Sequence, residues 1–346
     1  MNLGNFSDPA DWLSEAYDLL QRRRVSEALY AFNKAEGNGH PLSDCAAGRW
    51  MCWMLSGDFE SAWCESDALE RSGFSDPNRF WDGWPFDGKR ILLRALHGYG
   101  DAVQFIRYAP MLRRRAIKLT VQCHPELMPL LRNVDGVDET VTWPDSPGWR
   151  TKWDQQIEIM ELPRAFRTTL GSIPNRVPYI SIEHELVERS RTRLAKTDKP
   201  KVGLLWASSQ YDPSRSTDLK MWAPILRVAG FEFYSFQRGA ERAQLEFTNA
   251  NVNDTAVHSH QMVETAADLT NMELLISVDT FGAHLAGALN RPVWLLLPYT
   301  ADWRWMLNRH DSPWYPSTRL FRQSRPGDWS SIIYEVAAEL SRVVFF

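Results

Sequence analysis

The stretch 276–298, ISVDTFGAHLAGALNRPVWLLLP, constrains the fold more than any other part of the chain. An apolar run at 274–278 predicts a strand, Asp279 and Thr280 have the side chains of a turn and of a helix N-cap, and 283–289 has the composition of a helix. A second apolar run, VWLLL, follows directly. Strand, tight turn, helix and strand in this order predict parallel strands in an α/β fold.

The turn after the first of these strands is also a candidate anion site. Gly282 predicts a close approach of backbone to ligand, and His284 in the first helical turn adds a hydrogen-bond donor. A helix N-terminus presents free N–H groups and a partial positive charge, which suit a diphosphate. Nucleotides bind at such turns in open α/β sheets. The alternative is a purely structural turn, since every α/β protein contains strand-turn-helix units.

Composition excludes several classes of protein. The 346 residues are 44% hydrophobic and 24% charged, which is ordinary for a soluble globular chain of two or three domains. A net charge of −4 gives no sign of a nucleic-acid partner, and the four cysteines lack CxxC spacing. No apolar run has the length of a membrane span, and the start MNLGNFSDPADW lacks a signal sequence. We therefore expect a cytoplasmic protein with reduced cysteines.

The N-terminal segment repeats at an offset of 34 residues. VSEAL at 25–29 aligns with FESAW at 59–63, so that the small residues Ala28 and Ala62 correspond. That period is typical of the helix-turn-helix tetratricopeptide unit, and it predicts two helical hairpins within residues 9–72. The module, placed at residues 1–75, serves either as a packing cap or as a holder of an acceptor protein or another partner.

From Gly88 onward strand and helix patterns alternate, as in doubly wound sheets. The polar, proline-terminated stretch KTDKP divides this part into a domain at 76–197 and a second at 198–346. Between Trp143 and Arg176 we expect loops and one short helix near 162–170. Further helices are predicted at 102–115, 184–196, 221–229 and 261–270, and an amphipathic closing helix at 329–344. The predicted architecture is two α/β domains that face each other across a cleft.

HGYGD follows the first strand of the first α/β domain. Gly98 and Gly100 permit close backbone approach, and Asp101 falls at the N-terminus of the next helix. A carboxylate there takes a proton from an acceptor hydroxyl or amide. Helix capping explains Asp101 equally well.

WASSQYDPSRSTDLK opens the second α/β domain with hydroxyls and cations in a loop that follows a strand. Ser208, Arg215 and Lys220 suit phosphate oxygens, although a polar surface loop has the same composition. Glu241 suits ribose hydroxyls, with a solvated helix carboxylate as the alternative. In PYTADWRWM, Asp302 and Arg304 are placed to pair with each other, and most of the 16 tryptophans are expected to serve core packing.

Motifs for other chemistries are missing from the sequence. We find no DxD at a strand end, no His/Cys/carboxylate cluster with metal spacing, no Walker loop and no serine elbow. This predicts a mechanism without metal, in which dipoles and cations of the protein stabilise a leaving diphosphate.

Taken together, these segments resemble bacterial tetratricopeptide proteins with a GT-B domain similar to the heptosyltransferase family. The resemblance rests on the repeats, WDGWPFDGKRILL with HGYGD, VGLLWA, YSFQ, SVDTFGAHLAGAL and PVWLLLPYTADWRWMLNRHDSPWYPSTRLFRQ. It implies Asp101 as the base and phosphate contacts from Lys220, Asp279, Thr280 and His284. The implied side of the nucleotide-sugar donor comprises Ser208, Arg215, Lys220, Gln237, Glu241, Asp279, Thr280, Gly282 and His284. The implied acceptor side comprises His97, Gly98, Gly100 and Arg107.

The chain also departs from that family pattern. Leu96 and His97 stand where relatives have Glu-Gln, Phe281 replaces a small or hydroxyl residue, and Ser208-Ser209 replaces Gly-Asn. The departures fall in the base and nucleotide-sugar sites.

The resulting hypothesis is an inverting glycosyltransferase that uses no metal and no cofactor beyond its nucleotide-diphosphate sugar and acts on a protein or glycan acceptor. One alternative is a tetratricopeptide scaffold with a catalytically inactive GT-B domain. Another, less favoured, is a GT-B nucleotide-sugar epimerase.

Overall fold

The structure is a computed structural model that describes residues 11–74, 79–143, 153–194, 198–209, 211–248 and 251–343. The chain forms two compact units. Unit 1 gathers the described residues of Met1–Arg79, Pro163–Ile173 and Thr300–Arg309, and unit 2 contains the remainder. The chain therefore enters unit 1 three times.

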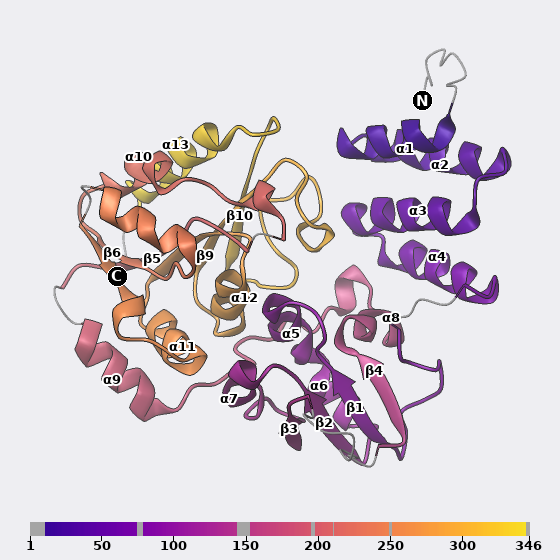
Figure 1. The fold of residues 1–346 in the computed structure, drawn as a ribbon, viewed down its shortest axis with the longest axis horizontal. Coiled ribbons are helices and arrows are strands. Elements are labelled where there is room, and N and C mark those ends of the chain that lie inside the picture. The colour runs from indigo at the N-terminus through magenta and orange to yellow at the C-terminus, as the bar shows by residue number, and fades with distance from the viewer. Residues whose placement is uncertain are drawn as a thin grey trace. The chain divides into compact units, whose positions relative to one another are not determined.

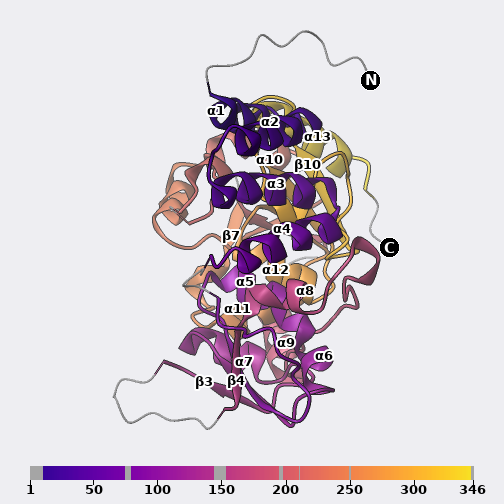
Figure 2. The same ribbon diagram turned by 90° about the vertical axis from the view of Figure 1, so that its right-hand side faces the viewer.

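Unit 1 is built on four helices that follow one another in Figure 2, namely α1 (Trp12–Gln21), α2 (Val25–Gly37), α3 (Leu42–Ser56) and α4 (Phe59–Arg71). Each helix packs on the next. Helices α2 and α4 begin at Val25 and Phe59, the residues that the 34-residue offset aligns, and Ala28 and Ala62 are fully buried. The predicted pair of helical hairpins is confirmed, whereas the tetratricopeptide identity stays a prediction.

The segment Thr300–Arg309 completes unit 1 through a tryptophan. The ring centroid of Trp303 lies 5.7 Å from that of Trp50 and 6.3 Å from that of Phe59, both with the rings edge to face. Nearby, the backbone N–H of Leu307 donates to the carbonyl of Leu55 at 2.9 Å. The prediction that these tryptophans serve packing is confirmed for Trp303, Trp305 and Trp314, which are all buried.

Pro163–Ile173, the other late segment of unit 1, is held by charge and hydrogen bonds. It starts within α8 (Leu162–Ala165), where the buried Arg164 pairs with Asp67 at 2.8 Å and with Glu70. The indole N–H of Trp63 donates to the carbonyl of Thr168 at 2.8 Å. Helix α4 is thus joined to residues about a hundred positions later in the chain.

Unit 2 contains two sheets in which all paired strands run parallel (Figure 1). The first has the order β3-β2-β1-β4, with β1 (Arg90–Arg94), β2 (Lys118–Gln122), β3 (Glu139–Val141) and β4 (Gln155–Glu158). The second has the order β10-β9-β8-β5-β6-β7, with β5 (Lys201–Leu205), β6 (Glu232–Ser235), β7 (Val252–Asp254), β8 (Leu274–Val278), β9 (Val293–Leu297) and β10 (Thr318–Arg322). The direction of winding reverses between β1 and β4 and between β8 and β5. Ligands of open α/β sheets bind at such switch points.

Helices connect these strands. They are α5 (Tyr99–Phe105), α6 (Ala109–Arg113), α7 (Met128–Leu131), α9 (His184–Leu194), α10 (Ala223–Leu226), α11 (Met262–Thr270), α12 (Phe281–Ala288) and α13 (Trp329–Leu340). The predicted stripe of the closing helix is buried at Ile332, Val336 and Leu340. The predicted fold class, an α/β pair of parallel sheets preceded in sequence by a short all-α module, is confirmed.

Several predicted elements differ from the observed ones. Strand β4 lies where loops were expected between Trp143 and Arg176, and residues 144–152 of that segment lie outside the described residues. The helix predicted at 102–115 is interrupted by a 3-10 turn at Ile106–Tyr108. The domain boundaries at 75 and 197 stay a prediction, although two segments from the predicted α/β domains belong to unit 1. Among the described residues, no helix combines the length and apolar character needed to cross a membrane.

Candidate functional site

Two turns predicted to carry chemistry meet within unit 2. One follows β1 and leads into α5, the other follows β8 and leads into α12, and these two helices pack together. A Cβ added to Gly100 would lie 2.9 Å from Cδ2 of His284, and the rings of Tyr99 and Phe281 are 5.9 Å apart. Gly100 therefore lacks a side chain because α12 passes close to it. The turn that carries Asp101 and the turn that carries Thr280 therefore lie next to each other.

The start of α12 has the geometry that the sequence predicts. Thr280 is the extended N-cap residue, and its hydroxyl accepts from the N–H of Ala283 at 3.4 Å and lies 3.1 Å from the hydroxyl of Ser277. Gly282 has a packing reason for its small size, because an added Cβ would overlap the side chain of Leu205 on β5. An approach of ligand to Gly282 stays a prediction.

Asp279 is a buried carboxylate between two proton-bearing side chains. Its oxygens lie 3.7 Å from Nη1 of Arg215 and 3.7 Å from Nε2 of His284. The other ring nitrogen of His284, Nδ1, is 3.0 Å from the hydroxyl of Tyr315. Burial raises the pKa of Tyr315 well above its usual range, so this phenol stays neutral. The imidazole thus has a polar neighbour at each ring nitrogen. Tyr315 lies in the long C-terminal block that carries the resemblance, but sequence reasoning gave it no role of its own.

Arg107, predicted on the acceptor side, lies beneath this group. It is 3% exposed, and its guanidinium donates to the hydroxyl of Tyr179 at 2.8 Å and to the carbonyl of Trp314. The guanidinium carbon also lies 4.6 Å from the ring centroids of Tyr179 and Tyr315. Arg107 packs on Tyr315, whose hydroxyl lies 3.0 Å from Nδ1 of His284, so this buried guanidinium helps to fix the position of the imidazole. A contact of Arg107 with the acceptor stays a prediction.

The turn after β1 brings Asp101 next to a second acid. The carboxylate of Asp101 accepts from the backbone N–H of Gly98 at 3.0 Å. Gly98 is the N-cap of α5, so Asp101 caps the helix from its third position instead of serving as the N-cap itself. Glu158, the last residue of β4, is 1% exposed, and its Oε1 is 3.9 Å from Nε2 of His97. Burial raises the pKa of Glu158 to about 8, and the carboxylates of Glu161 and Asp101 add to that shift. Sequence reasoning missed Glu158 because it missed β4, and an acid at the last position of a recognised strand would have been a signal.

A row of partly exposed rings borders the same turns. The ring of Tyr99 lies 4.9 Å from that of His124, which in turn lies 4.7 Å from that of Trp143. With Phe281 the row extends from Trp143, which follows β3, to the start of α12. Partly exposed aromatic rings of this kind stack on sugars and bases. This row also escaped sequence reasoning, because its members come from four separate segments, two of them helix starts and two of them loops.

The loop after β5 is the third part of the site. The N–H of Ser208 donates to the hydroxyl of Ser216 at 3.0 Å, which ties the strand end to the turn that carries Arg215. The side chain of Gln237 accepts from the N–H groups of Trp206 and Ala207 at 3.2 and 3.0 Å. Gln237 thereby fixes the end of β5, and a direct contact with the nucleotide sugar stays a prediction.

Lys220 and Glu241 stand apart from these contacts. Lys220 is exposed in a 3-10 turn at Leu219–Trp222, and Glu241 lies in the first turn of Ala240–Phe247. In the described part of the chain neither side chain forms a hydrogen bond or ion pair with Asp279. Their predicted roles therefore rest on the resemblance. By contrast, the predicted pairing of Asp302 with Arg304 is confirmed, with both carboxylate oxygens 2.9 Å from Nη1.

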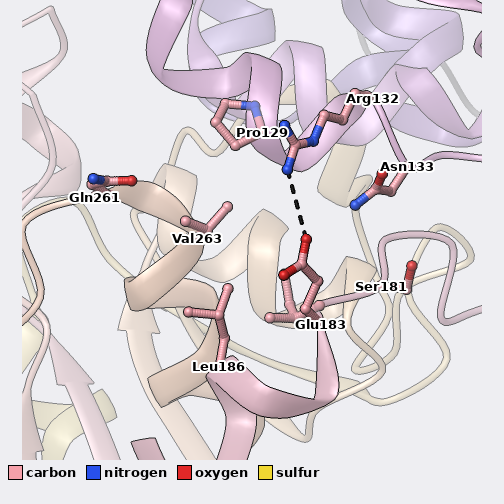
Figure 3. Close-up of a pocket in the computed structure, with 9 residues that line it drawn as sticks. Pro129, Arg132, Asn133, Ser181, Glu183, Leu186, Gln261 and Val263 are labelled. Carbon is pink, nitrogen blue, oxygen red and sulfur yellow. Dashed lines mark ion pairs between the residues drawn. The ribbon is translucent and has the colours of Figure 1, made fainter. Parts of the chain in front are cut away.

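A separate shallow pocket of about 240 Å³ lies beside α7, α9 and α11 (Figure 3). Across it, the exposed side chains of Arg132 and Glu183 form an ion pair at 3.7 Å. Its lining contains none of the residues predicted for the site: Pro129, Arg132, Asn133, Ser181, Ile182, Glu183, Leu186, Gln261 and Val263.

The fold is similar to those of two solved glycosyltransferases. The crystal structure of the glycosyl transferase family 9 protein from Veillonella parvula DSM 2008 superposes with a TM-score of 0.55 and 12% identity, covering 76% of this chain and 92% of that one. The ADP-heptose lipopolysaccharide heptosyltransferase II of E. coli superposes with a TM-score of 0.54 and 14% identity, covering 72% of this chain and 97% of that one. At such identities the likeness concerns the fold.

In sequence, the chain is similar to Protein FlbA of Caulobacter vibrioides, with 24% identity over 94% of this chain. The alignment covers 60% of that relative, so the chain spans about three fifths of its length. No family model matches the chain.

Proposed function

We propose that the chain is an inverting, metal-independent glycosyltransferase that moves a sugar from a nucleotide-diphosphate donor to an acceptor. The supporting observation is the meeting of two switch-point turns. Asp101 follows β1 next to β4, Asp279 and Thr280 follow β8 next to β5, and Gly100 packs against His284 between them. A base and an anion-binding helix terminus at one site match what direct displacement of a diphosphate requires. The fold shared with two glycosyltransferases agrees with this proposal.

In the proposed reaction, the Asp101 carboxylate takes the proton of an acceptor hydroxyl or amide. The acceptor atom then forms a bond to the anomeric carbon while the bond from that carbon to the diphosphate oxygen breaks. The nucleoside diphosphate departs with the bonding electrons, which are stabilised by the N–H groups of α12 and by the cations Arg215 and Lys220. One displacement inverts the anomeric centre and needs no covalent intermediate.

Asp279 has a different part in this proposal from the one that the resemblance implies. Its carboxylate repels a diphosphate, yet it lies 3.7 Å from both Arg215 and His284. We assign it the role of orienting these two side chains, which then meet the phosphate oxygens. Thr280, Gly282 and the α12 backbone form the rest of the cradle, with Ser208, Gln237 and Glu241 on the nucleotide side.

The acceptor is proposed to be a protein or a glycan, recruited through the helices of unit 1. The support is the 34-residue repeat and the four-helix stack. A cytoplasmic location and the absence of a further cofactor belong to the same proposal.

A panel of nucleoside diphosphates tests the first half of the proposal. A ligand that binds only the native state raises the unfolding temperature, so one of ADP, GDP, UDP or CDP should raise it at millimolar concentration. An unfolding temperature that no nucleotide changes would favour the scaffold with an inactive domain.

Asp101→Asn tests the chemistry. With the nucleotide sugar that the panel selects, we expect transfer to fall about 100-fold or more, with the nucleotide-induced rise of unfolding temperature retained. Asp135→Asn, at an exposed acid, is the control. Equal transfer by wild type and Asp101→Asn would rule out Asp101 as the base, and donor incubated alone would reveal epimerisation.

A further inference from the structure

One oxygen of Glu158 is buried without a hydrogen bond. The side chain is 2% exposed, and its Oε2 accepts from the N–H of Met160 at 2.6 Å. Oε1 has no hydrogen-bond partner among the described residues. A buried polar atom without a partner is costly, and such atoms concentrate where function requires them. Oε1 lies at the carboxyl end of β4 next to the Asp101 turn, which is a position where a functional requirement is expected.

Several charged and polar groups surround the Glu158 carboxyl. The guanidinium of Arg94 donates to Gln122 at 3.1 Å and stacks on Phe80, and the Glu161 carboxylate accepts from the backbone N–H groups of Phe80 and Glu158 at 2.9 and 3.0 Å. The Asp101 carboxylate accepts from Gly98. The backbone N–H of Leu96 also acts on this carboxyl, and the imidazole of His97 is an ionisable side chain whose Nε2 lies 3.9 Å from Oε1.

We propose that Glu158 is a positioning residue that orients the imidazole of His97 toward the acceptor, beside Asp101. The proposal rests on the transferase function proposed above. A neutral Glu158 carboxyl donates its O–H to Nε2 of His97, and a small rotation of the imidazole, which is 41% exposed, brings the pair to hydrogen-bond distance. The proton of His97 then sits on Nδ1, the ring nitrogen that does not face Glu158. From there it donates to the acceptor while Asp101 takes the acceptor's proton, so two groups fix one acceptor atom.

Helix α5 supports this arrangement, because it packs on the turn Ile159–Glu161 that follows β4. The Asp101 and Glu158 backbones are therefore held in a fixed relation. Glu158 and His97 come from β4 and from the turn after β1, the two strands that flank the switch point of the first sheet.

The orientation of His97 is measured without any substrate. In protein labelled with ¹⁵N-histidine, the His97 signals are assigned by their loss in His97→Gln. We expect the Nδ1–H tautomer in wild type and in Glu158→Gln, whose amide also donates, and the Nε2–H tautomer in Glu158→Leu. The wild-type His97 shifts should also change near pH 8, where Glu158 ionises, and Glu158→Gln should abolish that change. Glu139→Gln, at an exposed ion pair on β3, is the matched control. Identical His97 shifts in wild type and Glu158→Leu would overturn the proposal.

Kinetics test the acceptor side, with the nucleotide sugar that the panel selects. Glu158→Leu should raise the acceptor KM about tenfold and leave the nucleotide-sugar KM unchanged, as loss of one hydrogen bond predicts. His97→Gln with Glu158→Leu should be no worse than His97→Gln alone, because both changes remove the same contact. If the losses caused by His97→Gln and Glu158→Leu multiplied in the double variant, the positioning role of Glu158 would be refuted. If wild type transferred no sugar from any nucleotide sugar, the transferase function and the acceptor role of His97 would both be refuted. The tautomer measurement would still show whether Glu158 forms a hydrogen bond with His97.

Discussion

At the scale of the residue, the site depends on buried polar groups whose partners come from distant positions. Asp279, His284 and Tyr315 form one such chain, and Arg107 supports its end. Each member is held by a neighbour, so that small changes of charge are expected to act beyond the residue that is changed.

Glu158 makes stability depend on pH. Its pKa is about 8 in the folded chain against an ordinary value of 4.5, so the native state holds a proton that the unfolded state releases between these values. The stabilisation is complete below pH 4.5 and is lost as the pH rises through 8. Glu158→Gln should therefore be more stable than wild type at pH 8, on the order of a few kcal/mol, with a much smaller difference at pH 5. Urea unfolding at both pH values measures this, and an equal difference at the two would contradict the assignment.

Asp279→Asn keeps the shape of the side chain and removes the charge that holds Arg215 and His284. We expect nucleoside diphosphate to bind about tenfold more weakly, because two phosphate-binding groups lose their orientation. Asp212→Asn is a suitable control, since Asp212 contacts Arg215 from the loop at 3.4 Å without touching His284. Titration calorimetry compares the two variants. Tighter binding by Asp279→Asn would show that relief of charge repulsion outweighs the loss of orientation.

At the scale of the element, the contact of α5 with α12 brings the two turns together. The contact is close because Gly100 has no side chain at the point where His284 passes. Helices α5 and α12 each start at the carboxyl edge of a different sheet, and they pack directly against each other.

Gly100→Ala should separate these helices. The added methyl lies 2.9 Å from the His284 ring, and relief of such overpacking costs about 1–3 kcal/mol. We expect a lower unfolding temperature together with a larger loss of transfer than stability explains, because His284 moves. Gly171→Ala, which has open space around its added methyl, should change neither. Normal transfer by Gly100→Ala would argue against a shared site.

At the scale of the whole molecule, unit 1 is assembled from three stretches of chain, so the helical module is more than an N-terminal appendage. Trp303 and Arg164 join the late stretches to α3 and α4. The segment Thr300–Arg309 of the loop after β9 therefore belongs to the helical unit, although the strand before it belongs to the second sheet.

Trp303→Ala should reveal this assembly. Removal of a buried tryptophan costs about 3–5 kcal/mol, and the loss is expected within unit 1. Hydrogen exchange should accelerate in α3 and α4 while β5 and β8 keep their protection. Trp84→Ala, at a ring that is 68% exposed, is the control. Equal acceleration in both units would contradict a separate helical unit.

Local patterns in the chain were sufficient for the α/β class, the helical start and the turns at Asp101 and Thr280. Apolar runs and N-cap residues determine structure over a few neighbouring positions, so the sequence alone is enough to recognise them. The partners of those turns depend instead on strand order. Glu158 lies near the Asp101 turn because β4 lies beside β1, Tyr315 contacts His284 of α12 from 31 positions later, and Trp303 packs on Trp50 of α3 from far along the chain. Long-range packing set these contacts, because nothing in the local spacing of residues encodes which strand edges and helix faces meet.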